Sequence, residues 1–143
     1  MANIVPDSFK TDLLGGEFDF DSGGSTFKLA LYTDISGFST STTAYTTTNE
    51  VSSSGTGYTA AGNTLTNNGV AVASNIAYVD FADLTFSSVT LTADSALIYK
   101  SSSNNEAVLV LDFGGDKTAT NGDFVIQFPA ADSTNAIIRL GDA

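Results

Sequence analysis

The chain of 143 residues contains neither cysteine nor histidine. It therefore cannot supply a Ser-His-Asp triad, a cysteine nucleophile, a zinc site of the Cys/His type or an imidazole pH switch. Disulfide bonds are excluded as well, so cysteine usage says nothing about the redox compartment. The commonest catalytic and metal-binding groups are thus ruled out before any motif is considered.

Basic residues are also scarce, with five Lys and Arg against sixteen Asp and Glu, a net charge of −11 and a pI of about 4.1. Binding to nucleic acid or to an anionic membrane surface needs clustered basic side chains. Here they are scattered along the chain, at Lys10, Lys28, Lys100, Lys117 and Arg139. Because the basic residues are scattered, we expect no nucleic-acid partner. The sequence also has no run of 18 apolar residues and no visible secretory signal, so we expect no membrane partner.

Alternation of apolar and polar residues is the main pattern that is present. In FKLALYT, residues 27–33, Phe27, Leu29 and Leu31 share one face of a predicted strand. The same alternation recurs in the segments 70–72, 77–81, 89–91 and 124–128. Residues 96–99 and 107–113 are apolar on both faces, which predicts strands covered on both sides, either by the chain itself or by another subunit.

Glycine-containing dipeptides separate these segments and predict tight turns at Asn68-Gly69, Gly114-Gly115 and Asn121-Gly122. About eight to ten short strands with little helix are typical of a jelly-roll-like antiparallel β-sandwich. The length favours a single domain. We therefore predict an all-β sandwich over residues 17–143.

An N-terminal segment, residues 1–16, carries the one helix signal, in PDSFKTDLLGG. Asp7 or Ser8 is expected to cap the helix, and Gly15 to end it in the left-handed conformation. Phe9 and Leu13 lie one turn apart on one face. A helix of about two turns is marginal alone, so this face should dock on the body or on a partner.

The region between Asp34 and Asp80 is polar, and Glu50 is its only charge. Its aromatic residues Phe38, Tyr45 and Tyr58 stand among Ser, Thr and Gly. Exposed rings of this kind stack on sugars or anchor a protein interface, and the alternative is that each folds back over the sandwich edge. The stretch TTTNEVSSSGTGYTAAGNTL predicts a short strand at residues 49–51, a turn at 55–57 and a return toward a strand near residue 63.

Three motifs suggest chemistry only weakly. Asp112-Phe113-Gly114 spells the kinase metal triplet but lacks its companion motifs, and Gly55-Thr56-Gly57 lacks the third glycine and the lysine of a phosphate-binding loop. Asp19 and Asp21 share one face of EFDFD, which indicates a solvated strand face, with a loose calcium site or a catalytic carboxylate pair as alternatives. We predict no catalytic residue, no cofactor and no metal ligand, and hence no enzyme.

Several stretches together resemble a small structural protein of tailed bacteriophages, including short-tailed phages of cyanobacteria and other marine hosts. They cover nearly the whole chain and are VPDSFKTDLLGGEFDF, FKLALYT, TAYTTTNEVSSSGTGYTAAGNTLTN, AYVDFADLTFSSVTLTADSALIYKSS, VLVLDFGGDKTATNGDF and FPAADSTNAIIRL. The resemblance implies a non-enzymatic virion protein, in our reading a head decoration or cement protein made in the host cytoplasm and bound to the outside of the capsid.

The partners that this resemblance implies are the major capsid protein, other virion proteins and further copies of the chain. A homo-oligomer is expected, and a trimer would fit a local three-fold site of a shell. The helix over residues 7–14 or the polar loop 39–64 is expected to touch the capsid protein. Candidate interface residues are Phe9, Leu13, Phe38, Tyr45 and Tyr58. The alternatives are a tail or fibre adaptor and a receptor-facing carbohydrate-binding module.

Overall fold

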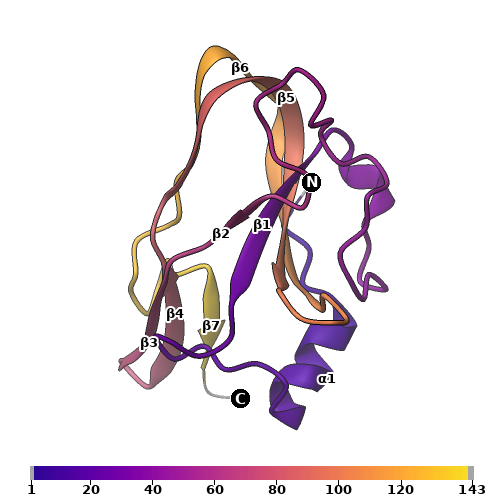
Figure 1. Cartoon of the computed structure of the whole chain (residues 1–143). Coiled ribbons are helices and arrows are strands. Elements are labelled where there is room, and N and C mark those ends of the chain that lie inside the picture. Colours follow the sequence, from indigo (N-terminus) through magenta and orange to yellow (C-terminus); the bar gives the residue numbers. More distant parts are fainter. Residues whose placement is uncertain (1, 142–143) are drawn as a thin grey trace.

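A computed structural model describes residues 2–141 and shows a sandwich of two antiparallel sheets with one short helix (Figure 1). The larger sheet has the order β2-β1-β5-β6 and the smaller one the order β3-β4-β7. The predicted all-β antiparallel sandwich with a short N-terminal helix is confirmed. The elements are α1 (Asp7–Gly15), β1 (Phe27–Tyr32), the 3-10 helix η1 (Ile35–Gly37), β2 (Asn63–Thr64), β3 (Asn67–Ala73), β4 (Ile76–Phe81), β5 (Leu84–Lys100), β6 (Ala107–Ile126) and β7 (Ile138–Leu140).

The three dipeptides predicted as turns are not turns. Gly114-Gly115 and Asn121-Gly122 lie inside the 20-residue strand β6, where its register against β5 shifts, and Asn68-Gly69 lies at a similar shift in β3. Gly69, Gly114, Gly115 and Asn121 have positive φ, which the hairpin turns of types I′ and II′ and the glycine type of β-bulge both use, so the local sequence does not separate the two. The β3–β4 hairpin instead turns at Ser74 and Asn75, with φ of 51° and 64°.

Phenylalanine side chains fill the space between the sheets. The rings of Phe20 and Phe27 stack at 4.6 Å between centroids, and Phe81 of β4 meets Phe27 edge-on at 5.7 Å. Phe20 and Phe18 reach this core from an extended connection that leads from α1 to β1. Offset and edge-on aromatic contacts of this kind hold the two sheets together.

A second apolar cluster covers the opposite face of the large sheet. Residues of β1, β5 and β6, among them Tyr32, Leu97 and Val110, are buried there beneath Phe38 and Ile4. Ile4 also exchanges two backbone hydrogen bonds of 2.9 Å with Val110. The strands that are apolar on both faces are therefore covered by the chain itself, through its N-terminal segment and the connection between β1 and β2.

Helix α1 begins at Asp7 as predicted, but other residues than those predicted occupy its capping positions. Pro6 occupies the position before its first turn, and no side chain within residues 2–141 caps it. Asp7 instead accepts from Lys10, and Ser8 donates to the carbonyl of Thr42, so neither side chain caps the helix. The left-handed residue at the C-terminal end is Gly16, with a φ of 86°, rather than Gly15.

Candidate interaction surface

The five residues predicted for an interface make contacts within the chain. Phe9, Phe38 and Tyr58 are buried, and Leu13 and Tyr45 are partly buried against the two core clusters. Phe38 meets Tyr32 edge-on at 4.7 Å, and Tyr45 stacks on Tyr99 at 4.9 Å. The aromatic rings thus fold back over the sandwich, which is the second of the two arrangements considered for them.

Glu50 lies in the long connection between β1 and β2 and is the centre of a polar cluster. Its Oε2 accepts a hydrogen bond of 2.6 Å from the phenol of Tyr45, and its Oε1 accepts one of 2.8 Å from the phenol of Tyr58. The backbone N–H of Ala61 donates to the same Oε1 at 2.6 Å. Hydrogen bonds to a charged acceptor are about twice as strong as neutral ones, so one carboxylate fixes three points of the connection.

Two further tyrosines extend this cluster into the large sheet. The phenol of Tyr32 donates to the carbonyl of Thr46 at 2.7 Å, and that of Tyr99 donates to the carbonyl of Ala61 at 2.7 Å. Burial and the nearby charge of Glu50 raise the pKa of the Tyr99 phenol to about 12. The same two causes raise the pKa of Tyr32, and burial, the hydrogen bond to Glu50 and the charge of Glu50 raise the pKa of Tyr45. The sequence marked Glu50 as an isolated charge, but its spacing to these tyrosines carries no signal for the cluster.

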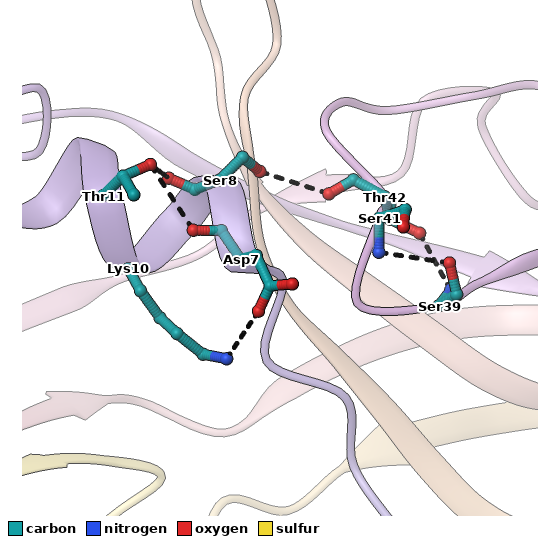
Figure 2. Close-up of polar contacts among 7 residues, drawn as sticks. All are labelled: Asp7, Ser8, Lys10, Thr11, Ser39, Ser41 and Thr42. Atoms are coloured by element: carbon teal, nitrogen blue, oxygen red, sulfur yellow. Dashed lines mark hydrogen bonds and ion pairs between the residues drawn. The ribbon is translucent and has the colours of Figure 1, made fainter.

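The start of α1 is tied to the polar connection, as Figure 2 shows for the residues around Ser8 and Thr42. The Ser8 hydroxyl donates to the Thr42 carbonyl at 3.2 Å, and the Asp7 N–H donates to the Thr40 carbonyl at 2.8 Å. The turn itself is held by Ser39, whose hydroxyl accepts from the N–H of Ser41 at 3.1 Å. The two segments expected to touch a capsid partner are therefore joined into one surface.

An apolar groove lies between α1 and β7, with a volume of about 580 Å³. Leu14 on the helix is 83% exposed and Leu140 on the strand is 61% exposed. Lys10 and Arg139 lie at the same groove. The other described residues that line it are Val5, Phe9, Leu13, Ile76, Val108, Leu109, Ile137, Ile138 and Gly141.

The apolar surface continues from this groove across the small sheet. Register pairs Leu140 with Ala77 and Ala77 with Val72, so the three side chains form a row on one face. Val72 is 72% exposed. Val70, Val79 and Ile138 form the next row on the same face, and Val79 is buried. The face of the small sheet that carries these two rows is therefore buried at Val79 and exposed to solvent at Val72.

The acidic pair Asp19 and Asp21 belongs to a turn. Oδ1 of Asp19 accepts a hydrogen bond from the N–H of Asp21 at 3.0 Å, and the backbone carbonyl of Asp19 accepts one from the N–H of Ser25 at 2.8 Å. Both side chains are exposed, while Phe18 before Asp19 and Phe20 between the two aspartates are buried. Within residues 2–141, no three Asp or Glu side chains gather into a group that could hold a metal ion.

A second hollow, of about 530 Å³, lies along β6 and the C-terminal segment. Phe113, Phe124 and Phe128 line it together with Lys117 and Asp123. The Asp112-Phe113-Gly114 triplet therefore lies at a strand bulge beside this hollow, with Gly114 at a φ of 74°. The triplet is therefore part of the backbone structure of β6.

Comparison of this chain with protein-family models, with curated proteins and with solved structures finds no match. In the part of the chain that the structure describes, no helix combines the length and the apolar character needed to cross a membrane.

Proposed function

We propose that this chain is a non-enzymatic structural protein of a phage virion, a decoration or cement protein that binds the outside of the major capsid protein lattice. The observation that carries the proposal is the continuous surface formed by α1, the turn at 39–42 and the apolar groove beside β7. Exposed apolar patches rimmed by polar residues mark interaction sites on soluble proteins. The resemblance to phage structural proteins supplies the kind of partner.

The physical basis of a cement role is linkage. A protein that binds only the assembled shell stabilises that shell by mass action, and many small contacts add over a symmetric lattice. The net charge of −11 keeps such a protein away from packaged DNA and soluble before assembly. A rigid, well-packed sandwich loses little conformational freedom when it docks, which favours binding through a modest interface.

A tail or fibre adaptor is the second candidate, because the same groove would serve a ring-shaped assembly equally well. The carbohydrate-binding alternative fits the structure less well. The rings of Phe38, Tyr45 and Tyr58, on which it depended, pack against other side chains of the chain. A glycan array probed with the purified chain tests this alternative, and strong binding to one glycan class would favour it.

Copy number separates the first two candidates. Quantitative mass spectrometry of purified virions should find the chain in copies on the order of hundreds for a cement protein, against about six to twelve for a tail component. Cryo-electron microscopy of the same particles should place density of a small sandwich on the head. Density confined to the tail, with the low copy number, would contradict the cement proposal.

A further inference from the structure

We propose that the groove between α1 and β7 binds an extended apolar segment of the partner protein, one that carries a carboxylate and adds as a strand to β7. This names a binding mode for the partner, and it rests on the proposed function only for that partner's identity. The groove has an edge strand, apolar walls and two basic side chains, and each selects one property of the occupant.

β7 is an edge strand of the small sheet. The sheet has the order β3-β4-β7, so within residues 2–141 the strand β7 pairs with β4 on one side and with no strand on the other. Figure 1 shows β7 as the strand of this sheet that lies toward α1. An extended peptide that pairs with such an edge gains main-chain hydrogen bonds, which give affinity with little dependence on sequence.

The apolar walls supply the places for side chains. Ile138 and Leu140 point to the same face of β7, and Leu13 and Leu14 of α1 line the groove with them. A volume of about 580 Å³ lies within the range of pockets that bind small ligands and short segments. Because side chains of a strand alternate, a segment with apolar residues at every second position would fill this space.

The charge feature selects an acidic occupant. The described lining residues are apolar, glycine or basic, and they include two of the five basic residues of a chain with a net charge of −11. Lys10 is paired with Asp7 at 2.8 Å, and a guanidinium nitrogen of Arg139 donates to the carbonyl of Thr134. Lysine has three donors and arginine five, so both side chains retain donors for a carboxylate.

A second copy of the chain fits the groove less well. The strand at the opposite edge of the same sheet, β3, reads NNGVAVA and carries no carboxylate. Two copies with a net charge of −11 each also repel one another at low ionic strength. These two facts favour a segment of a different protein as the occupant.

The test is a selection of random twelve-residue peptides, displayed on a carrier, against the immobilised full-length chain. Selected peptides are then synthesised with a fluorescent label, and their affinity is measured by anisotropy. The groove variants are Leu14→Gln and Arg139→Glu, both at exposed positions. The matched control is Val125→Gln, since Val125 is 55% exposed on β6 and lines the other hollow.

We expect enriched peptides to alternate apolar residues and to include Asp or Glu. Their affinity should fall about tenfold or more on either groove variant and stay unchanged on Val125→Gln. Failure to enrich such peptides, or equal affinity for the groove variants, overturns the inference. So does light scattering that shows a wild-type dimer and a Leu14→Gln monomer, because the occupant is then a second copy.

The result is separable from the proposed function. Absence of the chain from purified virions would remove the cement role, yet the peptide affinities and their loss on Leu14→Gln would stand. Conversely, a virion protein that binds no peptide through this groove would keep the cement role and lose the inference.

Discussion

The phenol of Tyr58 donates a hydrogen bond to Oε1 of Glu50 at 2.8 Å and accepts one from the backbone N–H of Leu31 at 3.0 Å. Leu31 belongs to β1, so this one side chain joins a sheet strand to the carboxylate that organises the long connection. A buried polar network of this kind rigidifies a structure when its members are satisfied and is costly when one partner is removed. The conformation of residues 45–62 therefore depends on Glu50.

Replacement of Glu50 by alanine should lower the free energy of unfolding by about 3 kcal/mol, because the phenols of the buried Tyr58 and the partly buried Tyr45 and the N–H of Ala61 lose their acceptor. Glu50→Gln, which keeps one acceptor oxygen, should cost less. Urea unfolding followed by circular dichroism measures both. The control Glu17→Ala, at an exposed position, should change stability by less than about 0.5 kcal/mol. Equal effects at the two positions would contradict the role given to Glu50.

Stability should fall at alkaline pH. Burial holds the pKa of Tyr99 at about 12, and burial also raises the pKa values of Tyr32, Tyr45 and Tyr58, whereas an unfolded tyrosine ionises near pH 10. The folded chain thus keeps phenol protons that the unfolded chain releases. This contribution is complete below about pH 10 and is lost as the pH rises toward about 12.

Urea unfolding at a series of pH values, with tyrosinate absorbance recorded in parallel, tests this dependence. Tyrosinate absorbance of the buried rings should appear together with unfolding. Tyr58→Phe should flatten the alkaline decline, because one raised phenol is removed. A free energy of unfolding that stays constant between about pH 9 and about pH 11 would argue against the predicted loss of stability at alkaline pH.

Gly62 should tolerate no side chain. It has a φ of 71°, and a Cβ at this position would lie 1.8 Å from the carbonyl oxygen of Leu29. Gly62→Ala should therefore cost about 3 kcal/mol or more, since backbone has to move. Gly55 is the matched control, because it has the same φ of 71° with nothing within 4 Å. Gly55→Ala should cost only the left-handed penalty, about 1 kcal/mol. Thermal unfolding of both variants measures these losses of stability. Similar losses at the two positions would refute the close approach of Gly62 to Leu29.

Phe9 and Leu14 lie on the same helix but should respond differently to truncation. The ring of Phe9 is buried and lies 5.1 Å from that of Phe18, so Phe9→Ala should lower stability by about 3 kcal/mol or more. Leu14→Ala should change it by less than about 0.5 kcal/mol, because this side chain is mostly in solvent. Chemical denaturation of the two variants provides the measurement. A mild effect at Phe9 would mean that α1 is not anchored through this ring.

Much of the fold follows from local sequence. The alternation in residues 27–33 predicts β1, and that in 77–81 predicts β4, with small differences at the ends. The local sequence also predicts a helix over residues 7–14, observed as α1 (Asp7–Gly15), and the turn at 55–57, which has positive φ at Gly55 and Gly57. These predictions succeed because side-chain period and glycine content act over a few residues. The dipeptides Gly114-Gly115 and Asn121-Gly122 failed as turns because bulge and turn share one local requirement, and only the pairing with β5 decides between them.

The candidate surface divides in the same way. The amino-acid sequence by itself determined the acidic, cysteine-free and histidine-free composition, the strand-forming segments and the helix with its apolar face. Only the tertiary structure decided that Phe9, Phe38 and Tyr58 are buried, that Glu50 meets Tyr45, and that Leu14 and Leu140 flank one groove. Period and propensity specify which face of a segment is apolar. What covers that face is set by contacts between residues far apart in the chain, such as α1 beside β7, and these depend on the packing of the whole molecule.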